Sequence, residues 1–123
     1  MKNYGIKSID GRVCVDASIF DNQQLHDSWQ WGDIGNYYGV GTSGLNFHEN
    51  MYYAYFNPGK RQGHPAEVAS TEPKHINITH RNEVTTGPEN SGDKVVVYGE
   101  PGSNIRTYRG TVPLNKRNFP IRC

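Results

Sequence analysis

Five histidines carry much of the acid–base and metal chemistry that this sequence could support. Zinc ligands must converge on one point. His75 and His80 are five residues apart, so on a strand they point to opposite faces, and the Ile and Thr residues between them disfavour a helix. We therefore expect no metal centre and no cofactor. Histidines at strand ends, facing solvent or a neighbouring subunit, are the simpler interpretation.

A polar loop, "PGKRQGHP", offers a hydrolytic alternative. A small nuclease or hydrolase needs a base, an acid and a cation. His64, Glu67 and the basic pair at 60–61 could supply all three, and His48 with Glu49 form a second acid–base pair. Nothing in the pattern fixes these side chains relative to one another, and no phosphate loop or nucleophile elbow is present. The sequence therefore favours a protein that is not an enzyme, with no catalytic residue.

Aromatic residues in a polar stretch indicate a binding surface instead. Trp29 and Trp31 share one face if "WQW" is extended, and Tyr37 and Tyr38 follow closely. Exposed aromatic side chains stack on sugars or anchor partner proteins. We predict that Trp29, Trp31, Tyr37 and Tyr38 form a partner-binding or glycan-binding surface. The aromatic residues of 52–56 are expected to fill a core that is poor in Leu and Ile.

The composition bounds the class of protein. A length of 123 residues fits one domain, 1–123, and 34% hydrophobic residues with 14 Gly and 7 Pro are typical of a loop-rich β-domain. A net charge near +1 argues against a nucleic-acid partner. No apolar run is long enough to span a membrane, so we expect no membrane insertion. The N-terminus also lacks the apolar region of a signal peptide.

The two cysteines, Cys14 and Cys123, are too few for a disulfide scaffold. They could pair with each other, because a C-terminal cysteine can fold back onto an early strand. For a chain without a leader, two free thiols are the expected state.

Strand-like segments recur between turn signals along the chain. The clearest hairpin is "YGIKSIDGRVCVD", where Asp10 and Gly11 suit a type I′ turn. Its expected buried face carries Tyr4, Ile6, Ser8, Val13, Val15 and Ala17. Further strands are expected within 45–57, 66–70, 75–80, 94–100, 104–112 and 119–123, and polar loops at 21–44 and 81–93. The strand in 45–57 is apolar on both faces, so both should be covered. These elements predict an all-β, single-domain sandwich or barrel of about seven or eight short antiparallel strands with long polar loops.

The opening "YGIKSIDGRVCVDAS" resembles the start of small tail-associated β-domain proteins of tailed bacteriophages. The residues that carry the likeness are Tyr4, Gly5, Ile6, Asp10, Gly11, Val13, Val15 and Asp16. The resemblance implies a compact β-domain near the tail tip or the fibre attachment, with a structural role. It implies no catalytic residue.

The first hypothesis is therefore a structural or accessory virion protein of a phage tail or particle. It would contact other virion proteins or copies of itself, and would reside in the virion after assembly in the host cytoplasm. A low net charge promotes association, and oligomerisation would explain doubly apolar strands. The alternative is a secreted carbohydrate-binding or receptor-binding β-module. A small hydrolase or nuclease is the third hypothesis.

Overall fold

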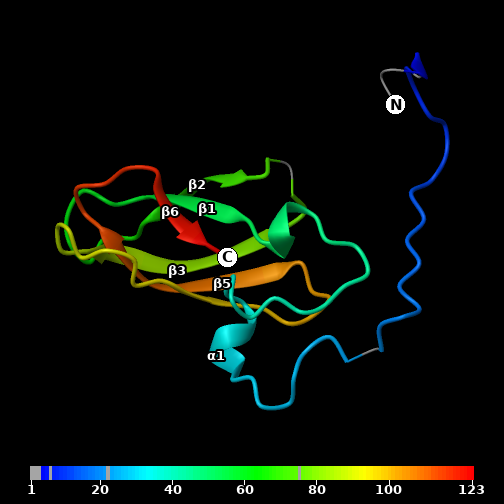
Figure 1. Ribbon diagram of the computed structural model, residues 1–123. Coiled ribbons are helices and arrows are strands. Elements are labelled where there is room, and N and C mark those ends of the chain that lie inside the picture. Colours follow the sequence, from blue (N-terminus) through cyan, green and yellow to red (C-terminus); the bar gives the residue numbers. More distant parts are fainter. Residues whose placement is uncertain (1–3, 6, 22, 75) are drawn as a thin grey trace.

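The computed structural model describes residues 4–5, 7–21, 23–74 and 76–123 (Figure 1). Within them, two short helical turns precede six strands. The elements are α1 (Trp31–Ile34), the 3₁₀ turn η2 (His48–Asn50), β1 (Tyr53–Asn57), β2 (Glu67–Glu72), β3 (Thr79–Gly87), β4 (Val96–Tyr98), β5 (Ile105–Pro113) and β6 (Phe119–Arg122). The prediction of an all-β domain is confirmed.

The six strands form two three-stranded sheets, ordered β2-β1-β6 and β3-β5-β4. The first sheet is antiparallel throughout. In the second, β4 is antiparallel to β5, but β3 runs parallel to β5, from Thr79 opposite Ile105 to Gly87 opposite Pro113. The sequence pattern indicated antiparallel strands only. The parallel pair arises because the chain crosses to the far edge of β5, forms β4 there, and returns through the centre of the sheet.

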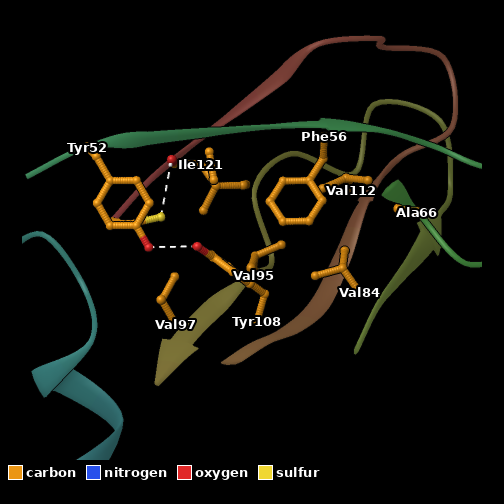
Figure 2. Close-up of a cluster of buried hydrophobic side chains, with 11 residues drawn as sticks. Tyr52, Phe56, Ala66, Val84, Val95, Val97, Tyr108, Val112 and Ile121 are labelled. Carbon is orange, nitrogen blue, oxygen red and sulfur yellow. Dashed lines mark hydrogen bonds between the residues drawn. The ribbon is translucent and has the colours of Figure 1, made fainter. Parts of the chain in front are cut away.

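The core lies between the two sheets, and each sheet contributes alternate residues of its strands (Figure 2). Ala54 and Phe56 of β1 face Tyr108 and Val112 of β5, and all four are fully buried. Phe56 meets Tyr108 edge to face, with ring centroids 5.5 Å apart. Burying a side chain such as Phe56 stabilises a fold by about 1.5–3 kcal/mol.

The opposite face of β1 is only half covered. Tyr53 and Tyr55 are partly exposed there, with Arg122 of β6 beside Tyr53. The prediction that this strand is covered on both faces is therefore wrong, because the described residues form no third layer on the outside of the first sheet (Figure 1).

The predicted N-terminal hairpin is not formed. The described residues of 4–17 contain no strand, and Ile6 lies outside the described residues. Tyr4 and Val13 are 85% and 90% exposed, and this segment runs apart from the sheets (blue in Figure 1). A hairpin of two strands is at best marginally stable unless a further strand or another surface covers its apolar face.

The stretch 81–93, predicted to be a polar loop, contains most of β3. Its inward residues, Val84 and Thr86, are buried against the core, whereas the polar residues 81–83 are exposed. A polar outer face hides the apolar alternation of this strand. Among the described residues, no helix has both the length and the apolar character needed to cross a membrane.

Candidate functional site

A cleft opens between the segment that follows α1 and the end of the second sheet. Its volume is about 340 Å³. Residues 34–43 form one side and residues 99–102 the other, with Tyr52, Arg106 and Cys123 also lining it. A concave site that gathers a few polar groups is the usual place to look for ligand binding. We call it the arginine cleft.

Asn36 fastens one wall of the arginine cleft to the sheet. Its side chain accepts a hydrogen bond from the Val97 N–H (3.2 Å) and donates one to the Val97 carbonyl (3.3 Å), so it acts as a neighbouring strand for the free edge of β4. The same amide donates to the Gly32 carbonyl at 2.6 Å. Gly35 lies so close to Val97 that a Cβ would collide with the β4 backbone. These contacts hold residues 31–39 in place.

Arg106 supplies the cation of the cleft. Its Nη1 donates to the carbonyls of Ser103 (2.7 Å) and Ile105 (2.9 Å), which fixes the guanidinium. Within the part of the chain that the structure describes, its Nε and Nη2 make no hydrogen bond. A guanidinium offers a planar fork of donors that matches a carboxylate. The arrangement can therefore bind a carboxylate in the cleft.

Gly99 makes room for this guanidinium. A Cβ at Gly99 would lie 2.6 Å from Cδ and 2.8 Å from Nε of Arg106. Any larger residue at position 99 must push the arginine side chain away. Glu100, which also lines the cleft, adds a negative charge at the rim, so the cleft presents both a cation and an anion.

A buried hydrogen-bonded chain lies behind the arginine cleft. The Tyr52 and Tyr108 hydroxyls are 2.7 Å apart, and the Tyr108 hydroxyl is 2.9 Å from Nδ1 of His80 (Figure 2 shows the two hydroxyls). Burial raises the pKa of both tyrosines and lowers that of His80. The consistent arrangement has Tyr52 donating to Tyr108 and Tyr108 donating to a neutral His80.

Cys123 is a poor nucleophile in this setting. Its thiol donates to the Ile121 carbonyl at 3.5 Å, and burial raises its pKa to about 12 (Figure 2). The thiolate is the reactive form of cysteine, and it is almost absent at neutral pH when the pKa is so high. Both cysteines are free, and Cys14 is exposed. Cys123 is therefore not suited to attack a substrate in the cleft.

The four predicted binding aromatics are exposed but not gathered in one place. Tyr37 and Tyr38 meet edge to face at 5.1 Å, and Arg122 of the first sheet lies 4.7 Å over Tyr37. Trp31 lines a different cleft on the second sheet. A partner-binding or glycan-binding role for Trp29, Trp31, Tyr37 and Tyr38 remains a prediction.

The predicted acid–base groups are not assembled into a site. Nε2 of His64 accepts a hydrogen bond from Nε of Arg61 at 2.5 Å, so that nitrogen is not free to act as a base. Glu67 is exposed on β2 and contacts neither of them by hydrogen bond. His75 lies outside the described residues. Among those that the structure does describe, no three His, Cys, Asp or Glu side chains are placed to hold a metal ion.

Sequence reasoning missed both residues that shape the arginine cleft. Arg106 alternates with apolar neighbours in an ordinary strand pattern, and Asn36 lies in a Gly-rich polar stretch. Asn36 and Val97 are 61 positions apart, so no local signal connects them. Only its burial, beside the exposed Tyr37, distinguishes Asn36, and burial is not visible in the sequence.

Comparison with known proteins gives a family match over the whole length. The model of the D-Ala-D-Ala carboxypeptidase 3 (S13) family matches residues 1–123. D-alanyl-D-alanine carboxypeptidase DacB of Haemophilus influenzae is 26% identical over 68 residues, which are 55% of this chain and 14% of DacB. The chain therefore spans only a small part of the length of this relative.

These matches overturn the virion hypothesis. The likeness to phage tail-associated proteins rested on an N-terminal hairpin that the structure does not form, whereas the carboxypeptidase model covers every residue. The predictions of a structural virion protein, of a protein that is not an enzyme, and of a location in the virion are all wrong, because the family consists of carboxypeptidases. The virion hypothesis was wrong because it relied on hydrophobic alternation in one short N-terminal segment.

Proposed function

Because the chain belongs to the D-Ala-D-Ala carboxypeptidase 3 (S13) family, we propose that it serves the hydrolysis of peptides ending in D-Ala-D-Ala, the stem peptides of peptidoglycan. A carboxypeptidase removes the last residue of a chain, so its substrate always presents a free terminal carboxylate. A fixed guanidinium suits recognition of that carboxylate, and Arg106 in the arginine cleft provides one.

The single observation that carries the proposal is the geometry of the Arg106 guanidinium. Two backbone carbonyls hold Nη1, and Gly99 leaves space beside Nε. The remaining donors are thus oriented before a ligand arrives, which reduces the entropy lost on binding. Glu100 at the rim can accept hydrogen bonds from an amino group or peptide N–H of the same ligand.

Ser91, the serine that sequence motifs suggest as a nucleophile, is not placed to attack a substrate. Penicillin-binding proteins use S-x-x-K together with S-D-N and K-T-G. The sequence has one S-x-x-K, Ser91 to Lys94, and neither of the other two motifs. The Ser91 Oγ is buried and has no hydrogen-bond partner among the described residues, while Lys94 is exposed. A hydroxyl shielded from solvent and without a base cannot attack a peptide bond.

The test compares an N-acetylated peptide ending in D-Ala-D-Ala with its C-terminal amide, by calorimetry on the whole chain. We expect the acid to bind and the amide to bind about tenfold or more weakly, because a hydrogen bond to a charged group contributes about 1.5–3 kcal/mol. Arg106→Gln should abolish this preference. Gly99→Ala should weaken it while keeping the charge, and the exposed Arg117→Gln is the matched control.

Two results would contradict the proposal. Equal affinity for acid and amide would remove the assigned role of Arg106, as would equal binding by the Arg106→Gln and Arg117→Gln variants. Release of D-alanine, followed in the same samples, separates binding from catalysis. If the chain releases D-alanine and Ser91→Ala stops it, the carboxypeptidase assignment stands, but the argument that Ser91 is not a nucleophile does not.

A further inference from the structure

A second cleft lies on the outer face of the β3-β5-β4 sheet. Its volume is about 180 Å³, and its lining includes Trp31, Arg81, Tyr98, Glu100 and Thr107. Tyr108 of β5 and Val97 of β4 point into the core, so their neighbours Thr107 and Tyr98 face outward. We call this the aromatic cleft, because Trp31 and Tyr98 are its two aromatic side chains.

Tyr98 is held in position by a short chain of charged groups. Arg109 lies over its ring, with the guanidinium carbon 5.7 Å from the centroid. Nε and Nη2 of Arg109 are 2.6 Å and 3.4 Å from the two Glu83 carboxylate oxygens. The outer face of the sheet therefore orients one aromatic residue of the cleft. Trp31, from α1, is 52% exposed and free to contact a ligand.

The chemistry of this cleft suits a sugar ring. The face of an aromatic ring carries partial negative charge and attracts the polarised C–H groups that cover one face of a pyranose. Sugar hydroxyls need donors and acceptors around the ring edge. Arg81 donates, Glu100 accepts and Thr107 does both. In the described lining, the charge of Arg81 is matched by that of Glu100, so a neutral glycan fits better than a polyanion.

The aromatic cleft adjoins the arginine cleft. Gly99 and Glu100 line both, so the end of β4 and the residues after it form a wall between them. In peptidoglycan the stem peptide is attached to a sugar, so a single ligand carries groups that suit both clefts.

We infer that the aromatic cleft binds a sugar unit of the glycan strand that carries the stem peptide. This inference rests on the proposed function, and it adds a second site on the opposite face of the same sheet. A ligand would then be held at two points, which raises the apparent affinity for polymeric substrate above that for a free peptide.

The chain has two tryptophans, and this makes a direct test possible. Trp29→Phe leaves Trp31 as the sole tryptophan, and Trp31→Phe leaves Trp29, which does not line the aromatic cleft. The probe is a tetrasaccharide of N-acetylglucosamine without any peptide. We expect the emission of Trp29→Phe to change and saturate with added tetrasaccharide, and that of Trp31→Phe to stay constant. No response in either variant, or an equal response in both, overturns the inference.

Further variants define the cleft and separate it from the proposed function. Tyr98→Ala should weaken tetrasaccharide binding tenfold or more and Tyr98→Phe only slightly, because the ring is retained. Arg109→Ala should weaken it a few-fold by freeing Tyr98. Arg106→Gln should leave sugar binding unchanged while removing the preference for a peptide carboxylate. Peptide binding without sugar binding overturns this inference alone, and sugar binding without peptide binding overturns the arginine cleft alone.

Discussion

Residues 4–28, which we call the N-terminal arm, and residues 51–123, the β-domain, differ in what their apolar side chains contact. Val13 of the arm is exposed, whereas Val97 and Val112 of the β-domain are fully buried. Both regions have valines in alternating patterns. In the β-domain a facing sheet covers the valines, whereas Val13 and Val15 of the arm are 90% and 42% exposed. Alternation thus indicates a possible strand, and a second surface is needed to stabilise it.

The largest expected difference between the two regions is in thiol reactivity. Cys14 lies in the arm and is exposed, whereas Cys123 is buried in the β-domain with its pKa raised to about 12. At pH 8 a pKa near 12 lowers the thiolate fraction roughly a thousandfold relative to a free cysteine. Titration with a disulfide reagent should detect one thiol in the native protein and two in denaturant. Two fast thiols in the native state would contradict the buried placement of Cys123.

Truncating a side chain should lower the free energy of unfolding much more in the β-domain than in the N-terminal arm. Phe56→Ala removes a fully buried ring, and we expect the free energy of unfolding to fall by about 3–5 kcal/mol. Val13→Ala in the arm is the control and should leave it unchanged. The measurement is urea denaturation followed by circular dichroism. If Phe56→Ala does not fold, Ile121→Val should still show a loss of about 0.5–1.5 kcal/mol. A similar fall in the free energy of unfolding for Val13→Ala would contradict the exposed position of Val13.

Asn36 connects the residues after the arm to the β-domain, and its loss should have an intermediate effect. Asn36→Ala leaves the N–H and carbonyl of Val97 without their side-chain partner. We expect the free energy of unfolding to fall by about 1–3 kcal/mol, and the Val97 amide hydrogen to exchange faster with solvent. Asn77→Ala, at an exposed position, is the control. Unchanged exchange at Val97 in Asn36→Ala would show that this amide does not pair with the β4 edge.

A smaller effect should appear as pH falls. Burial lowers the pKa of His80 in the folded state, so below its ordinary value near 6.5 the unfolded chain binds more protons than the folded one. The stabilisation is complete above pH 6.5 and is lost as pH falls through the lowered folded-state pKa. Denaturation between pH 7 and pH 5 should show this decline in the native chain and a weaker one in His80→Gln. The decline should persist in His26→Gln, because His26 is exposed in the arm.

Much of the β-domain could be predicted from sequence, because several strands are defined by local alternation. The segments around Val97, Tyr108 and Ile121 each alternate between turn residues, and each forms a strand. β3 was missed because its outward residues are polar and its stability comes from a parallel partner. The hairpin at Asp10 and Gly11 was predicted from a sound turn signal, but a turn signal does not provide a covering surface.

The candidate site could be predicted much less well. The arginine cleft depends on contacts between distant segments, such as the one between Asn36 and Val97, and no periodicity encodes them. Arg106 shows no local feature that separates it from other arginines in strands. The aromatic stretch that contains Trp31 was noticed because exposed tryptophans in polar sequence are unusual. Its relation to Tyr98 follows only from the packing of α1 beside β4.

The parallel pairing of β3 with β5 has a consequence for synthesis on the ribosome. β1 and β2 are near neighbours in sequence and can pair as soon as both have emerged. β3 cannot pair until β5 has been synthesised. The edge of β1 opposite β2 stays unpaired until β6 has emerged, since Tyr53 pairs with Arg122. Until then the strands have unpaired edges, and Phe56 and Val84 of the nascent chain are exposed to solvent. Growing chains in this state associate with one another. β6 is therefore the strand that completes the first sheet.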